Sequence, residues 1–158
     1  MSGIVDQVLK KAVEAALSER RLLLISDDGY ARSPSVDLFS LVHDKANLWL
    51  YPENGVHPRD LSERRVPHYI KRARETGLVI LTYSEPLLHG LRLAVRGGLI
   101  EPENVVILFV WFNEETGERC VCRPLVDLRG NLSEWPHGFF DQIEKDLSEM
   151  IGWENASP

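Results

Sequence analysis

The sequence has few cysteines and no long apolar run. Of its 158 residues only Cys120 and Cys122 are cysteines, one residue apart. Such near neighbours on a strand bridge poorly, and no nearby His or Cys completes a zinc site, so we expect a reduced pair. No apolar run approaches the roughly 20 residues that span a bilayer, which predicts no membrane association. The first residues show no basic region followed by an apolar core, so we expect no secretory signal and a cytoplasmic location.

Positively charged residues are fewer than negatively charged ones. The chain carries 18 Lys and Arg against 24 Asp and Glu, a formal net charge of −6. This balance argues against broad nucleic-acid binding by the isolated chain, although a local basic patch remains compatible with it. A hydrophobic fraction of 44% with 27% charged residues is ordinary for a globular protein. The length predicts one domain, residues 1–158.

Hydrophobic periodicity predicts alternating helices and strands. Helical spacing indicates a first helix at 4–17, and Pro67 should kink or split the helix expected from about 58 to 75. Continuous apolar runs are typical of parallel strands covered on both faces, and turn residues at 113–118 indicate a hairpin. The expected strands are 21–26, 48–51, 78–83, 104–112 and 119–126; the other expected helices cover about 35–43, 85–97 and 139–151. The fold class is α/β, with a mixed, mainly parallel sheet flanked by helices and a C-terminal β-hairpin and helix.

Four stretches, in this order, resemble a known family. They are Ile25 to Ser35 (against "D-V-G-F-G-V-S-Q"), Leu48 to Pro58 (against a strand and "E-E-P-E-x-x-L-H-P"), Val79 to Leu88 (against a strand ending in "T-H-S"), and Gly130 to Gln142 (against "G-x-x-x-x-W-P-x-G-F-F-D"). Together they are similar to the carboxy-terminal half of ABC-like AAA ATPases, relatives of the overcoming-lysogenisation-defect and SMC groups. The resemblance implies a P-loop NTPase-like half domain: an N-terminal helix at 4–20, a signature-to-switch core at 21–100 and a C-terminal hairpin and helix at 101–153.

The chain departs from this family where the chemistry would lie. No G-x-x-x-x-G-K-[ST] is present, so the phosphate-cradling loop is missing. Leu50 and Tyr51 replace the acidic pair that would hold magnesium and orient water. The switch histidine corresponds to Tyr83. The resemblance therefore implies a degenerate domain with no catalytic residues and no cofactor, its motif positions being Asp28, Gly29, Leu50, Tyr51, Glu53, His57, Tyr83 and Ser84.

Some polar residues allow two interpretations. Asp27 and Asp28 after a strand suit a magnesium site, but Asp-Asp-Gly is also good turn chemistry, which we favour. His57 before Pro58 could approach a nucleotide, yet Pro at a helix start is ordinary boundary chemistry. For both, structure is the favoured role.

Basic and aromatic residues suggest interaction surfaces. Arginines concentrate in the 58–75 region, where a solvated helix face is the common explanation and contact with phosphate or an acidic partner the functional one. Trp135 and the Phe139-Phe140 pair either pack on the sheet or face a partner. The interaction candidates are Arg64, Arg65, Arg72, Arg74, Trp135 and Phe139.

These patterns favour a non-catalytic, ATPase-like binding or regulatory subunit. It would act through contact with a protein partner or with itself, and an active ATPase in a defence or DNA-maintenance system is a candidate partner. The alternative is a cryptic nucleotide-binding or metal-dependent hydrolytic enzyme that uses Asp27, Asp28, Glu53 and His57.

Overall fold

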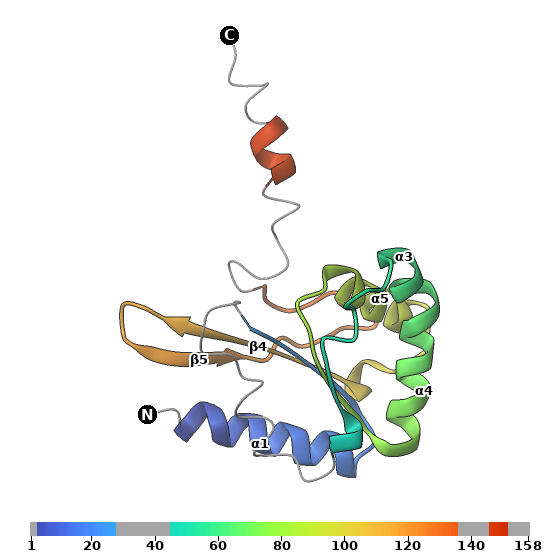
Figure 1. Ribbon diagram of the computed structural model, residues 1–158, viewed down its shortest axis with the longest axis horizontal. Coiled ribbons are helices and arrows are strands. Elements are labelled where there is room, and N and C mark those ends of the chain that lie inside the picture. Colours follow the sequence, from blue (N-terminus) through green and yellow to red (C-terminus); the bar gives the residue numbers. More distant parts are fainter. Residues whose placement is uncertain (1–2, 28–44, 136–145, 152–158) are drawn as a thin grey trace.

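A five-stranded sheet forms the centre of the computed structural model, which describes residues 3–27, 45–135 and 146–151 (Figure 1). The strand order is β2-β3-β1-β4-β5. The strands β2, β3, β1 and β4 are parallel, and β5 is antiparallel to β4. Their bounds are β1 Leu22–Asp27, β2 Leu48–Leu50, β3 Leu78–Leu81, β4 Val105–Asn113 and β5 Glu118–Cys122. The mixed, mainly parallel sheet predicted from the sequence is confirmed.

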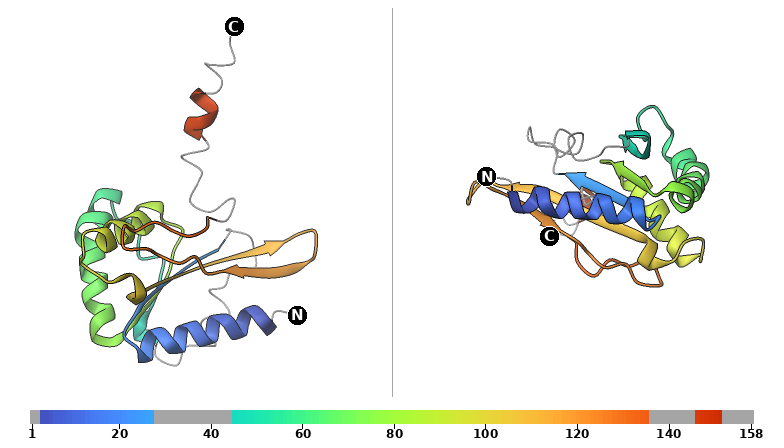
Figure 2. Two further views of the ribbon diagram at one scale, coloured as in Figure 1. Left: turned by 180° about the vertical axis from the view of Figure 1, so that it is seen from behind. Right: turned by 90° about the horizontal axis from the view of Figure 1, so that it is seen from below.

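Helices cover both faces of the sheet, which explains why the central strands are apolar along their whole length. Helix α1, Gly3–Ser18, packs on one face through Val5, Leu9, Val13 and Ala16. Helices α4, Val66–Thr76, and α5, Glu85–Arg96, lie on the other face (Figures 1 and 2). The buried stripe of α1 begins at Val5, and the preceding apolar residue, Ile4, is 80% exposed.

The helical segment predicted from 58 to 75 is divided into three parts. Helix α3, Pro58–Asp60, leads into a π-helical turn, Leu61–Arg65, and then into α4. Pro67 lies in the first turn of α4 and has no amide hydrogen to donate to the preceding turn. The backbone instead closes a wider ring, in which the Val66 amide donates to the Leu61 carbonyl. The division expected at Pro67 is therefore present.

The C-terminal part differs from its predicted boundaries. Strand β5 ends at Cys122 instead of continuing to Val126, and Pro124, without an amide hydrogen, cannot extend the ladder. Val126 forms an isolated antiparallel bridge with Leu132. Residues 146–151 are helical, with Leu147, Met150 and Ile151 exposed. The helix expected at 35–43 and the first part of that expected at 139–151 lie outside the described residues. Within the described ranges, no helix is long and apolar enough to cross a membrane.

Candidate functional site

Two tyrosines lie together at the carboxyl edge of β2 and β3. Leu50 pairs with Leu81, and the Tyr51 amide donates to the Leu81 carbonyl over 2.7 Å. Tyr51 and Tyr83 therefore leave neighbouring strands at the same edge. Their rings stack with centroids 4.8 Å apart, and their hydroxyl oxygens are hydrogen-bonded at 2.9 Å. The positions expected to correspond to the acidic pair and the switch histidine thus meet in space, joined through phenol rings.

The backbone of Tyr51 is unusual for a bulky residue. Its φ of 49° lies in the left-handed region, which costs a non-glycine residue about 1–2 kcal/mol. Tyr51 also packs against the core cluster on the α1 face, together with Leu50. The ring stack, the hydroxyl contact and this packing together hold the conformation in place.

Hydrogen bonds to Glu53 join the loop after β2 to the end of β3. Its Oε1 accepts a hydrogen bond of 2.7 Å from the Thr82 hydroxyl, and its Oε2 accepts one of 3.1 Å from the Tyr83 amide. The Thr82 oxygen in turn accepts from the Ser84 amide over 2.9 Å. Thr82 is fully buried, so its bond to Glu53 satisfies a hydroxyl group that water cannot reach. Both carboxylate oxygens of Glu53 are engaged in the fold.

Ser84 and His57 each cap a helix. The Ser84 hydroxyl accepts from the Leu87 amide at the start of α5. His57 Nδ1 accepts from the Arg59 amide at the start of α3, as the boundary interpretation predicts. An open pocket of about 440 Å³ lies between these helix starts. Its lining residues are Glu53, Asn54, Val56, Pro58, Leu61, Tyr83, Ser84, Glu85 and Pro86.

The acidic pair at the end of β1, Asp27 and Asp28, has no side chain among those that the structure describes. Asp28 and Gly29 lie outside the described residues, and Asp27 is placed only as the last residue of β1. Across ranges 3–27, 45–135 and 146–151, no group of three or more His, Cys, Asp or Glu side chains is arranged to hold a metal ion.

All four arginine candidates have partners within the fold. Arg64 and Arg65 both form ion pairs with Asp60, at 3.6 and 3.3 Å. Arg72 Nη2 donates to the Asn47 side chain over 3.3 Å, and the Arg74 guanidinium donates to the Leu99 carbonyl. Arg64 is the more exposed of the two ion-paired arginines, with 82% of its side chain accessible to solvent.

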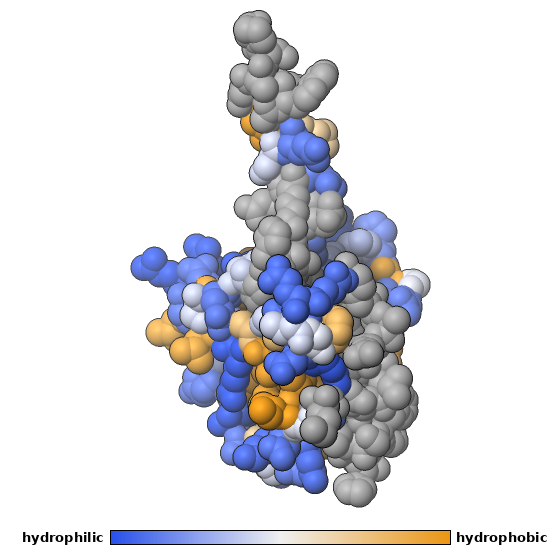
Figure 3. Space-filling model, turned by 90° about the vertical axis from the view of Figure 1, so that its left-hand side faces the viewer, coloured by the Kyte–Doolittle hydropathy of each residue, from blue (hydrophilic) through white to orange (hydrophobic). Residues whose placement is uncertain are grey.

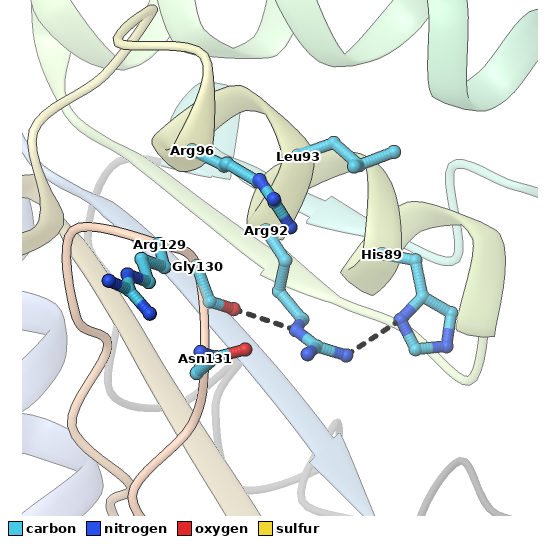
Figure 4. Close-up of a pocket in the computed structure, with 7 residues that line it drawn as sticks. All are labelled: His89, Arg92, Leu93, Arg96, Arg129, Gly130 and Asn131. Atoms are coloured by element: carbon cyan, nitrogen blue, oxygen red, sulfur yellow. Dashed lines mark hydrogen bonds between the residues drawn. The ribbon is translucent and has the colours of Figure 1, made fainter.

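Trp135 marks a second pocket, which the sequence interpretation missed. The ring is half-buried, stacks on His89 and lies 5.4 Å from the Arg92 guanidinium carbon. The pocket measures about 220 Å³ and is lined by His89, Arg92, Leu93, Arg96, Arg129, Gly130 and Asn131 (Figure 4). The spacing of His89, Arg92 and Arg96 places them on one helix face, a signal present in the sequence. The sequence pattern does not predict that residues 129–131 lie against this face of α5. Phe139 lies outside the described residues.

Comparison with known proteins gives one partial match. Residues 100–150 match the family model of DUF3696, a protein family of unknown function that is commonly associated with AAA-ATPase-like proteins. The matched region contains β4, β5 and the 127–131 turn, whereas the Tyr51–Tyr83 edge lies before it. No curated protein and no solved structure matches the chain.

Proposed function

We propose that this chain is a non-catalytic, ATPase-like binding or regulatory subunit that acts through protein contact. The observation that carries the proposal is the Tyr51–Tyr83 pair at the carboxyl edge of β2 and β3. Ligands of open α/β sheets bind outside the carboxyl ends of the strands. Here two stacked phenol rings lie at that edge, and the nearby Glu53 carboxylate is committed to Thr82 and Tyr83. The partial DUF3696 match is compatible with an ATPase-like origin.

Calorimetry with ATP and magnesium tests the non-catalytic part. A site without a phosphate cradle and an acidic pair should bind MgATP more weakly than a low-micromolar dissociation constant, which corresponds to roughly −8 kcal/mol. Tight binding or metal-dependent turnover would favour the alternative, a cryptic nucleotide-binding or hydrolytic enzyme. The alternative requires Glu53 and His57 to release the hydrogen bonds that they make in the fold.

Exposed apolar side chains support the protein-contact part. Ile4, Leu93, Leu125 and Leu128 are between 63% and 80% exposed. Figure 3 shows an apolar area on the side that carries the β4–β5 hairpin and the beginning of α1, with hydrophilic residues along part of its border. Apolar surface bordered by polar residues is typical of contact sites. The exposed Arg64 and Arg65 would steer an acidic partner, with apolar contacts supplying most of the binding energy.

Sedimentation velocity of the pure chain, then pull-down from its native cell extract with the Ile4→Glu variant, tests this contact. Ile4→Glu puts a charge at an exposed apolar position of α1, and Gln7→Glu puts the same charge at an exposed polar position of that helix. We expect self-association or retrieval of an ATPase partner, weakened by Ile4→Glu and unchanged by Gln7→Glu. A strict monomer that retrieves no partner would refute the proposal.

A further inference from the structure

The pocket between α5 and the 127–131 turn contains three arginines from two separate segments. Arg92 and Arg96 extend from α5, and Arg129 extends from the turn (Figure 4). Arg92 is half-buried, whereas Arg96 and Arg129 are exposed. The described lining includes no carboxylate. Three arginines therefore line one small pocket, and no carboxylate is among its described lining residues.

The turn that carries Arg129 is fixed by its own hydrogen bonds. The Asp127 carboxylate accepts from the Arg129 amide at 2.8 Å and from the Asn131 amide at 2.9 Å. The hydrogen bond from Asn131, with that from Arg129, lowers the pKa of Asp127. The Asp127 amide also donates to the Asn131 carbonyl over 3.0 Å. The Asp127 carboxylate thus accepts from backbone amides, and the positive charge of Arg129 lowers its pKa further.

Arg92 is held in place before any ligand arrives. Its Nε donates to the Gly130 carbonyl over 2.8 Å, and its Nη1 lies 3.1 Å from His89 Nδ1. Its guanidinium lies over the Trp135 ring, an arrangement favourable for a cation. Burial first, and then the positive charge of Arg92, lower the pKa of His89, which favours a neutral imidazole that accepts from Arg92. A pre-positioned guanidinium loses little freedom when it binds an anion.

We propose that this pocket binds a phosphate group, held by Arg96 and Arg129 against the fixed Arg92. Guanidinium groups bind phosphate oxygens through charge-assisted hydrogen bonds, and a dianion would offset the repulsion among the three arginines. The volume of about 220 Å³ is below the roughly 300–1,000 Å³ of ordinary small-molecule pockets, so it suits one oxyanion group. The group comes either from free inorganic phosphate or from a nucleotide whose remaining part stays outside. The inference does not depend on the proposed function.

NMR titration of the full chain with sodium phosphate tests the proposal, against sodium chloride at equal ionic strength. The reporters are the Trp135 indole NH and the Gly130 and Asn131 amides, which adjoin the pocket. We expect saturable shifts of these signals with phosphate and none with chloride. Equal shifts with both salts would overturn the proposal, because they would reflect charge screening alone.

Variants locate the phosphate and separate its sources. Arg96→Gln and Arg129→Gln should each weaken phosphate binding roughly tenfold, since each removes charge-assisted hydrogen bonds from an exposed position. Arg59→Gln, which makes the same charge change on the exposed start of α3, should leave the affinity unchanged. Equal losses in all three variants would overturn the assignment. A parallel titration with AMP distinguishes the sources: tighter binding than phosphate identifies a nucleotide, and equal or weaker binding identifies the free anion.

Discussion

The carboxyl edge of β2 and β3 and the pocket beside α5 use polar side chains in opposite ways. At the edge, Glu53 accepts from Thr82 and Tyr83, and the two tyrosine hydroxyls bond to each other. In the pocket, Arg92 is fixed by the fold, and Arg96 and Arg129 are exposed lining residues, with no carboxylate in the described lining. The edge satisfies its polar groups internally, and the pocket keeps hydrogen-bond donors available.

This difference separates structural from ligand-directed polarity. A buried donor or acceptor that loses its partner costs about 1–3 kcal/mol, so the bonds of Thr82 are expected to contribute mainly to stability. An exposed arginine contributes little to stability through surface ion pairs and can bind an anion at small cost. Substitutions at the edge should therefore change the free energy of unfolding, and those at Arg96 or Arg129 should change binding.

The largest effect is expected where the pocket is joined to α5. Gly130 has a φ of 79°, and a Cβ there would collide with the backbone carbonyl of Arg92. Gly130→Ala should lower the free energy of unfolding by about 3 kcal/mol, because left-handed strain adds to the displacement of the turn. Urea denaturation measures the change, and phosphate binding should weaken with it.

Gly98→Ala is the matched control for that substitution. Gly98 has a similar φ of 76°, but a Cβ there would meet no atom within 4 Å. This variant should cost only the backbone strain, about 1 kcal/mol. Equal losses for both glycines would show that Gly130 is not required for contact with α5.

Glu53→Ala breaks the internal network of the edge. It removes the acceptor for the buried Thr82 hydroxyl and for the Tyr83 amide. The free energy of unfolding should fall by about 2 kcal/mol. Glu63→Ala, which removes an exposed partner of Arg59, should cost less than about 0.5 kcal/mol in the same denaturation experiment. If the free energy of unfolding falls equally little in both variants, the Glu53 contacts do not stabilise the edge.

The sequence predicts this fold well where the signal is local. The continuous apolarity of Leu22 to Ile25 and of Leu78 to Leu81 indicates strands covered on both faces, and both segments are fully buried. Pro67 predicts the division of the 58–75 segment because the missing amide is a property of one residue. The site is harder to predict. The Tyr51–Tyr83 pair depends on the register between β2 and β3.

Other contacts depend on residues far apart in the chain. Arg92 and Gly130 are 38 positions apart, and no periodicity in the sequence brings them together. The helix predicted at 4–17 is present, but its first predicted residue, Ile4, is exposed, and the packing of this helix on the sheet starts at Val5. Helical spacing gives the direction of a side chain but not where its neighbour ends.

Tyr83→Phe isolates the hydroxyl contact of the edge. The substitution keeps the stacked ring and removes the oxygen that lies 2.9 Å from the Tyr51 hydroxyl. It should lower the free energy of unfolding by about 1 kcal/mol. Tyr51→Phe should have a similar effect. The double variant should cost less than the sum of the two single variants, because each single variant already removes the same hydrogen bond. Strict additivity in thermal or urea denaturation would show that the two hydroxyls are independent.

The smallest effect concerns the titration of His89 in the pocket. Burial, followed by the charge of Arg92, lowers the pKa of His89 below its ordinary value of 6.5, and Glu85 opposes this shift. The unfolded chain therefore takes up a proton at a higher pH than the native protein does. The stability that His89 contributes is present above about pH 6.5 and is lost as the pH falls below it. Arg92→Gln removes a nearby positive charge, so the NMR titration midpoint of His89 should rise towards 6.5 and the loss of stability in acid should become smaller. Arg59→Gln, on the distant α3, should leave the midpoint unchanged; an unchanged midpoint in Arg92→Gln would show that burial alone sets the pKa of His89.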